Sequence, residues 1–317
     1  MTSTPNGPVH AQHPPGNDHA EDVPGLSDAR LLLAAAINGL LTVVQVIGGL
    51  LSGSLSLVAD ALHNLGDAGA LLIAWAARRV GRKPADRYQT FGYRRVELIG
   101  ALINATTLNL VGLYLIYEAV MRVVDPPPVA GWTVVIVATV ALAVDVVTAL
   151  LTYAMARGSL NVKASFVHNV TDALGSVAVI VAGILILRYQ LYLADVIATF
   201  LIAGYALYHG VVITQQASRI LMLGVPVDIH VPALADALRA VDGIVDVHHV
   251  HVWDLDESQK SFEAHIVVER QDAALAEEVK QLARAVLERH GITHSTLECE
   301  YGAVKDGCRE GEVVTPH

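Results

Sequence analysis

Cysteine is nearly absent from the sequence. Only Cys299 and Cys308 occur, both near the C-terminus, and they do not form a C-x-x-C motif. A disulfide framework and a thiolate metal cluster are therefore not expected, and we expect both thiols to be reduced. The sequence also lacks H-E-x-x-H, the helical zinc motif of many metalloproteases.

Charged residues are also scarce. They make up 16% of the chain, whereas 53% of its residues are hydrophobic, and the mean hydropathy is +0.48. This composition excludes two ordinary soluble domains. The apolar residues form long blocks, each close to the ~20 residues that a helix needs to cross a bilayer. The blocks span residues 31–51, 55–77, 98–120, 131–155, 173–187 and 193–214. They predict an all-α membrane domain of six transmembrane helices in contact with the lipid bilayer.

The polar segments divide the chain further. Residues 1–28 contain histidines, are acidic, and lack a basic segment before the first block, so we expect a disordered tail and not a cleaved signal peptide. Residues 29–222 are predicted to form the transmembrane domain. Residues 223–302 are predicted to form a soluble domain, and residues 303–317 a flexible tail.

The distribution of basic residues predicts the orientation in the membrane. The SGSLS segment at 52–56, between the first two blocks, has no charge. The next loop has many positive charges, namely Arg78, Arg79, Arg82, Lys83, Arg87, Arg94 and Arg95. Because basic loops stay on the cytoplasmic side, this loop, both termini and the soluble domain are predicted to be cytoplasmic, in the cell membrane.

Two helices carry the same polar motif. His63 and Asp67 in the second block, and His168 and Asp172 in the fifth helix, each form H-x-x-x-D. Residues four apart lie on one helical face. One such pair alone could be a hydrogen-bonding group between helices, but a second copy favours metal binding. Together the two pairs would supply the four nitrogen and oxygen ligands of a tetrahedral zinc site.

The ligand types narrow the choice of metal. Magnesium and calcium prefer more oxygen ligands and copper(I) prefers sulfur, so zinc fits best, with cadmium, cobalt or nickel as alternatives. No organic cofactor is expected. Two carboxylates close together in a low dielectric favour uptake of protons when no metal is bound, so metal loading should expel protons.

Further polar residues lie in the same blocks. Asn38, Gln45 and Asp60 belong to the first two blocks, and Asp145 lies in the fourth. Buried ionisable groups in membrane helices commonly mark ion or proton paths. Asp145 could extend the path, or it could pair with an amide such as Gln45.

Four stretches resemble the cation diffusion facilitator family of zinc transporters. They are SGSLSLVADALHNLGD (52–67), FGYRRVELIGALIN (91–104), LNVKASFVHNVTDALGS (160–176) and VHHVHVWDL (247–255). The resemblance covers about residues 28 to 302. It implies a transport site made of the two His-Asp pairs, exchange of metal for protons, and a homodimer joined partly through the cytoplasmic domains.

The sequence departs from the family pattern at two places. Some bacterial relatives have a second metal site, made of an Asp and two His, in the loop after the second helix. The corresponding residues are Asp86, Gln89 and Tyr93, so we expect that site to be missing. Asp145 stands where many zinc-transporting relatives have Asn.

The soluble part is predicted to be an α+β domain, and it resembles the ferredoxin-like, metallochaperone-like domain of that family. Its elements are expected in the order α-β-β-α-β, at residues 231–241, 245–254, 261–269, 272–290 and 294–301. Leu275, Val279, Leu282 and Val286 are predicted to form the buried stripe of the last helix. The alternation of side chains in VHHVHVW places His248 with Val250 on one face of the strand.

The resemblance implies metal ligands in this domain as well. It extends most directly to His248, His265 and Glu300, with His294 as a further candidate. These side chains could instead face water or the dimer interface. If they bind zinc, the metal would act as a regulator.

Three functions remain as alternatives at this point. A zinc/proton antiporter that exports divalent cations is the first, a membrane zinc sensor without transport the second, and an intramembrane zinc hydrolase the third. A hydrolase needs an open coordination position, which four protein ligands would close, so it is not favoured. Nucleic acid is not expected as a partner.

Overall fold

The computed structural model describes residues 28–81, 83–155, 160–256, 258–269, 273–301 and 313. Side chains at several helical positions, 160–169 among them, fall outside this description. The predictions for both tails, for Cys308 and for the side chain of His168 therefore lie outside the described residues.

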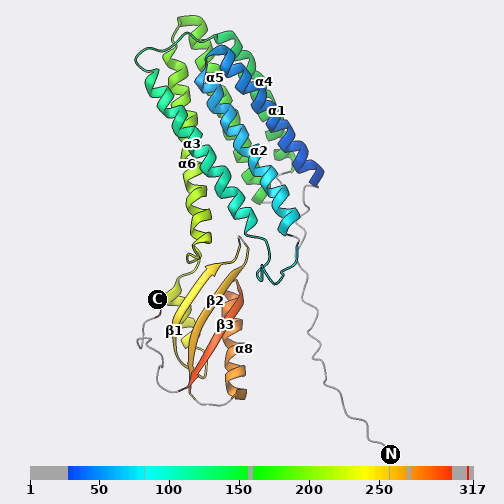
Figure 1. Cartoon of the computed structure of the whole chain (residues 1–317), viewed down its shortest axis with the longest axis vertical. Coiled ribbons are helices and arrows are strands. Elements are labelled where there is room, and N and C mark those ends of the chain that lie inside the picture. Colours follow the sequence, from blue (N-terminus) through cyan, green and yellow to red (C-terminus); the bar gives the residue numbers. More distant parts are fainter. Residues whose placement is uncertain are drawn as a thin grey trace, which may run out of the picture.

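Long helices make up the first part of the described chain, as predicted (Figure 1). They are α1 (Asp28–Ser52), α2 (Leu55–Gly81), α3 (Val96–Met121), α4 (Gly131–Met155), α5 (Leu160–Tyr189) and α6 (Leu193–Leu221). Each predicted block corresponds to one of them. α5 begins well before residue 173, and the apolar block did not include its first turns because they are polar. In the described residues, stretches of α1, α3, α5 and α6 are long and apolar enough to cross a membrane. α4 has a shorter apolar stretch, and the polar residues of α2 lower its hydropathy.

The helices pack as neighbours in pairs: α1 with α2, α4 with α5, and α3 with α6. α2 also contacts α3, α5 and α6, which places its polar residues inside the bundle. Small residues allow the close approach of α2 and α3, since a methyl group added at Gly69 would lie 2.5 Å from Oδ1 of Asn104.

Asp195, in the first turn of α6, fixes the start of α2. Its carboxylate accepts hydrogen bonds from the hydroxyls of Ser54 (2.5 Å) and Ser56 (2.6 Å) and from the backbone N–H of Leu55 (2.8 Å). The first N–H groups of a helix have no partner within the helix, so a carboxylate from another helix can accept their hydrogen bonds. Its negative charge also interacts favourably with the positive end of the helix dipole. This buried polar residue therefore has a structural role in joining α6 to α2.

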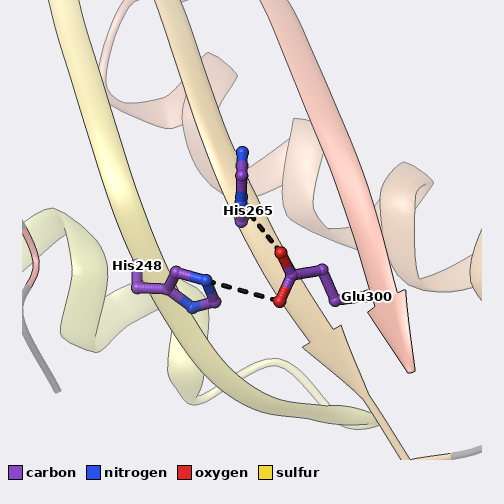
Figure 2. Close-up of side chains that lie close together, drawn as sticks. All are labelled: His248, His265 and Glu300. Atoms are coloured by element: carbon purple, nitrogen blue, oxygen red, sulfur yellow. Dashed lines mark hydrogen bonds and ion pairs between the residues drawn. The ribbon is translucent and has the colours of Figure 1, made fainter. Parts of the chain in front are cut away.

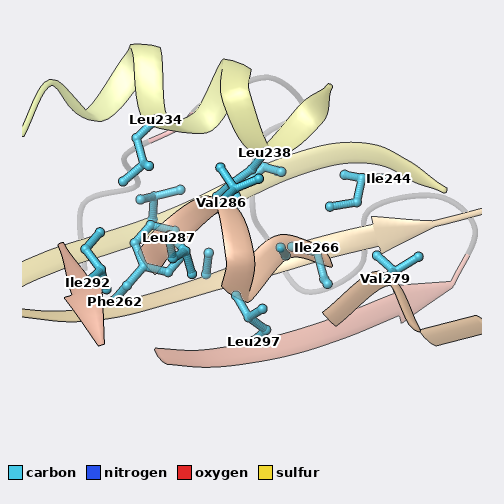
Figure 3. Packing of buried hydrophobic residues seen from close by; sticks show 14 of the residues in the cluster. Leu234, Leu238, Ile244, Phe262, Ile266, Val279, Val286, Leu287, Ile292 and Leu297 are labelled. Atoms are coloured by element: carbon cyan, nitrogen blue, oxygen red, sulfur yellow. The ribbon is translucent and has the colours of Figure 1, made fainter. Parts of the chain in front are cut away.

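The C-terminal domain, predicted to be cytoplasmic and called the cytoplasmic domain below, has the predicted α-β-β-α-β order. Its elements are α7 (Val231–Arg239), β1 (Ile244–Asp254), β2 (Lys260–Val268), α8 (Ala273–Arg289) and β3 (Ile292–Tyr301). β2 is the central strand, antiparallel to β1 and parallel to β3. Both helices cover one face of the sheet, and the apolar core lies between them and the strands (Figure 3).

Two details of this domain differ from the prediction. Leu282 is exposed, and Ala283 takes its place in the buried stripe of α8, whereas Leu275, Val279 and Val286 face the core as predicted. The second difference concerns β1. A register shift follows His248, and His249 has a left-handed backbone with φ of 53°. Such a bulge interrupts the alternation of side chains. Val250 therefore belongs to the core, whereas His248 pairs with His265 on the opposite face.

The loop between α2 and α3 contacts the cytoplasmic domain. The guanidinium of Arg95 donates hydrogen bonds to the backbone carbonyls of Leu255 (2.9 Å) and Asp254 (3.3 Å). Arg94 lies 3.4 Å from the carboxylate of Asp256. A cavity of about 260 Å³ lies between this loop and the turn after β1. The domain is thus attached to the bundle through side chains as well as through the chain that follows α6.

Candidate metal sites

The polar centre of the bundle joins α2 to α5. Nε2 of His63 lies 2.7 Å from Oδ1 of Asp172, and both side chains are largely buried. Asp67 offers a carboxylate oxygen within 4.8 Å of these two groups. Three of the four residues predicted from the H-x-x-x-D repeat are therefore brought together by the fold. One imidazole and two carboxylates at this spacing can converge on a single divalent cation.

The fourth predicted residue is His168. Its backbone is in α5, four residues before Asp172, and its side chain is outside the described residues. The structure therefore leaves its ligand role as a prediction.

A second polar network lies beside this centre. Nε2 of Gln45 donates to Oδ2 of Asp60 (2.5 Å), and the amide of Asn64 donates to Oε1 of Gln45 (2.8 Å). The hydroxyl of Ser176 lies 3.0 Å from Oδ2 of Asp145 and 3.4 Å from Oδ2 of Asp60. Ser176 thus links the two carboxylates. The alternative that Asp145 pairs with Gln45 is wrong, because the amide of Gln45 is held by Asp60 on the neighbouring helix.

Asn38 is placed differently from the other predicted path residues. It is half-buried in α1, and its backbone carbonyl accepts a hydrogen bond from the hydroxyl of Thr42 (2.8 Å). The contacts described for it do not connect its side chain to Gln45.

The sequence prediction missed Glu97 and His209. Both line a cavity that also reaches His63 and Asp67. The rule that singled out Asp145 applies equally to His209, which lies inside the block 193–214, and would have found it. Glu97 lies in the first turn of α3, just before the block 98–120, so that rule does not reach it.

The cytoplasmic domain contains a second cluster, on the face of the sheet away from α7 and α8 (Figure 2). Nδ1 of His265 lies 2.9 Å from Oε1 of Glu300, and Nε2 of His248 lies 3.4 Å from Oε2 of the same carboxylate. The ring of His248 is fully buried, yet neither of its nitrogens nor Oε2 of Glu300 has a partner with hydrogen-bond geometry. Buried polar atoms without such partners are uncommon and fit a site that holds a cation.

Two further histidines, His249 and His251, lie beside this cluster, and the third, His294, lies away from it. The ring of His249 stacks on that of His265 with centroids 4.7 Å apart, and His251 contacts His249. His294 is exposed, contacts the ring of Phe91 in the α2–α3 loop, and pairs in register with Ser261. The fold does not bring it to His265.

Asp86, Gln89 and Tyr93 lie in the α2–α3 loop, at the positions where some relatives have a second metal site. Here they form hydrogen bonds with one another and with neighbouring backbone groups. The hydroxyl of Tyr93 donates to Oδ2 of Asp86 (2.7 Å), and the backbone N–H groups of Tyr88 and Gln89 donate to its other oxygen. The hydrogen bond from Tyr93 is the main reason that the pKa of Asp86 lies below its usual value. Cys299 is a half-buried free thiol, and burial raises its pKa.

The helical bundle and the attached α+β domain define an integral membrane protein with two clusters of metal-binding residue types. Residues 31–222 match the cation efflux transmembrane domain, and residues 226–301 match the cation efflux protein cytoplasmic domain. The chain therefore belongs to the cation efflux family, also called the cation diffusion facilitators. Members of this family are transporters and not enzymes, which excludes the hydrolase alternative. The C-terminal domain is cytoplasmic.

Relatives match almost the whole chain. The cadmium, cobalt and zinc/H(+)-K(+) antiporter of Bacillus subtilis is 32% identical over 290 residues, which cover 90% of this chain and 92% of that protein. The metal cation efflux system protein CzcD of Cupriavidus metallidurans is also 32% identical, over 90% of each chain. The zinc transporter ZitB of Escherichia coli is 31% identical, over 91% of this chain and 92% of that protein.

Proposed function

We propose that the protein is a zinc/proton antiporter that exports divalent cations from the cytoplasm, with cadmium, cobalt and nickel as further substrates. The observation that carries this proposal is the cluster of His63, Asp67 and Asp172 inside the helical bundle. A sensor without transport would not need its ligands at this depth. Relatives named for zinc, cadmium and cobalt transport support the same function.

His63, Asp67 and Asp172 are proposed as ligands of the transported ion, and His168 is proposed as the fourth because it repeats the spacing of His63. Two carboxylates balance the charge of a dication, and the neutral imidazoles add affinity without further charge. Tetrahedral nitrogen and oxygen ligands favour zinc.

Protons and metal compete for the same atoms. The hydrogen bond between His63 and Asp172 occupies one ring nitrogen and one carboxylate oxygen, and both are atom types that bind zinc. Metal loading must break this bond and release a proton held there. A side of the membrane that is rich in protons then favours release of the metal, which couples the two fluxes.

The network around Asp60 is proposed as the proton or metal path beyond the site. α2 runs toward the cytoplasm, so Asp60 lies on the side of His63 away from the cytoplasmic domain. Gln45 and Asp145 join Asp60 directly or through Ser176. Asn38, nearer the cytoplasmic start of α1 than Gln45, is proposed as a part of the path on the cytoplasmic side of this network.

The cytoplasmic domain is proposed to bind zinc as a regulator and to join two chains in a homodimer. His248, His265 and Glu300 are the proposed ligands, since their buried atoms are close together and incompletely hydrogen-bonded. His294 is not included, because it contacts Phe91 instead. Zinc at this site would favour one arrangement of the dimer and thereby bias the membrane domain.

The division of the chain follows from these roles. We assign residues 29–222 to transport and residues 223–302 to regulation and dimerisation, with residues 1–28 and 303–317 as tails. The cell membrane is the proposed location, with the N-terminus on the cytoplasmic side together with the C-terminal domain.

Zinc flux into proteoliposomes tests this function. The purified protein should move zinc into vesicles whose interior is acidic, faster than into vesicles without a pH gradient. A protein that binds zinc tightly but carries no flux would instead be a sensor.

A further inference from the structure

A cavity of about 410 Å³ lies between α2, α3 and α6 and reaches the proposed transport site. His63 and Asp67 form part of its wall, and Glu97, Asn104 and His209 lie on the same wall. A water molecule takes about 30 Å³ in the liquid, so the cavity has room for a divalent cation with its hydration shell.

The cavity extends toward the cytoplasm. Glu97 is in the first turn of α3, two residues after Arg95, and both Arg94 and Arg95 contact the cytoplasmic domain. Leu108, at the other end of the wall, is eleven residues further along α3, or about 16 Å at the rise of an α-helix. The cavity therefore joins the cytoplasmic end of the bundle to the level of His63.

His209 stands at the inner end of this cavity. Its ring lies 4.4 Å from that of Tyr205, and the ring of Tyr205 lies 6.1 Å from that of His63, measured between centroids. The side chain of His209 is exposed, although it lies in the middle of an apolar helix. An imidazole at this place can replace one water of an incoming ion before His63 and Asp67 replace others.

We infer that this cavity is the cytoplasmic access route of the transported cation, with Glu97 as the acidic group at its mouth and His209 as a transient ligand next to the transport site. The inference rests on the proposed transport function. Glu97 raises the local concentration of cations, and Asn104 offers an amide between the two ends. Neither Glu97 nor His209 belongs to the two H-x-x-x-D pairs.

Blocking the cavity tests the route. Ala101 lines the cavity, so Ala101→Phe places a ring inside it. Thr106→Phe is the control, because it adds the same ring at an exposed position of α3 outside the cavity. Zinc uptake is measured in vesicles whose cytoplasmic domains face the medium. We expect Ala101→Phe to slow uptake about tenfold while equilibrium zinc affinity stays that of the parent, and Thr106→Phe to transport normally. Normal uptake by Ala101→Phe would show that the cation does not pass through this cavity, for example because a lipid chain fills it. That result would overturn the proposed access route.

His209→Gln tests the ligand and adds no bulk. We expect the half-saturating zinc concentration to rise about fivefold with little change in maximal rate. In Glu97→Gln we expect the half-saturating zinc concentration to rise by a smaller factor. Tyr208→Phe is the control, because Tyr208 neighbours His209 without lining the cavity. An unchanged half-saturating concentration in His209→Gln overturns its role. Absence of flux in the parent would instead contradict the proposed function.

Discussion

Nε2 of His63 lies 2.7 Å from Oδ1 of Asp172, although the two residues are 109 positions apart in the chain. The contact joins α2 to α5, two helices that otherwise touch little in the described structure. A membrane helix gains no hydrophobic stabilisation from burying such polar groups. We propose that the contact is part of the site for the transported dication.

Asp172→Ala should abolish transport. The substitution removes one ligand and the hydrogen-bond partner of His63, so we expect zinc uptake to fall at least ~100-fold. Uptake of zinc by proteoliposomes measures the effect. Asp125→Asn, at an exposed loop position, is a control for loss of a carboxylate and should transport like the parent. Normal uptake by Asp172→Ala would place the site elsewhere.

His63→Asp should change which metal binds. Replacing an imidazole by a carboxylate makes the site harder and adds a negative charge, so zinc affinity should fall about tenfold while manganese binding becomes measurable. Isothermal titration of parent and variant with zinc, cadmium and manganese measures these affinities. If the relative affinities of the three metals stayed as in the parent, His63 would not determine selectivity.

Asp145→Asn should separate metal binding from proton movement. Oδ1 of an asparagine can still accept the hydrogen bond from Ser176, so the structure is retained while one protonatable group is lost. We expect zinc affinity within about threefold of the parent and fewer protons moved per zinc. Ser176→Ala, which removes the link to Asp60, should act in the same direction. An unchanged ratio of protons to zinc in both variants would exclude this path.

Glu300→Ala should remove zinc from the cytoplasmic domain. In the full chain carrying Asp172→Ala, the zinc that remains bound is expected at His248 and His265, and loss of their shared carboxylate should weaken that binding at least ~10-fold. Equilibrium dialysis measures the bound zinc, with Glu288→Ala on the exposed side of α8 as the matched control. Equal zinc content in both variants would show that Glu300 is not a ligand.

The contact between Arg94 and Asp256 should be insensitive to pH in the physiological range. Burial raises the pKa of Asp256, but hydrogen bonds from Ser258 and Gln259 outweigh it, so the net pKa lies below the usual value. A carboxyl with a lowered pKa contributes stability that is present above its unfolded pKa and is lost only as pH falls through the folded pKa. Hydrogen exchange at the turn after β1 should therefore be equally protected between about pH 5 and about pH 8. Asp256→Asn should reduce that protection throughout this range, and a marked loss of protection in the parent toward pH 5 would contradict the assignment.

The sequence predicted the elements of the fold and the central cluster because both depend on simple periodicities. Apolar block length determines the membrane helices, and the repeated spacing of His and Asp identifies Asp67 and Asp172 before any contact is known. The bulge at His249 could not be predicted, since alternation assumes a regular strand. Likewise, only the packing of α1 on α2 decides that Gln45 meets Asp60 and not Asp145.

The central claim is that zinc and protons exchange at the atoms shared by His63 and Asp172. The most direct test measures zinc uptake and internal pH together in proteoliposomes without an imposed pH gradient. We predict that zinc enters while the interior becomes more alkaline, and that both signals vanish in Asp172→Ala. Zinc uptake by the parent with no change in internal pH, under conditions where an ionophore confirms that pH changes are detectable, would contradict the exchange.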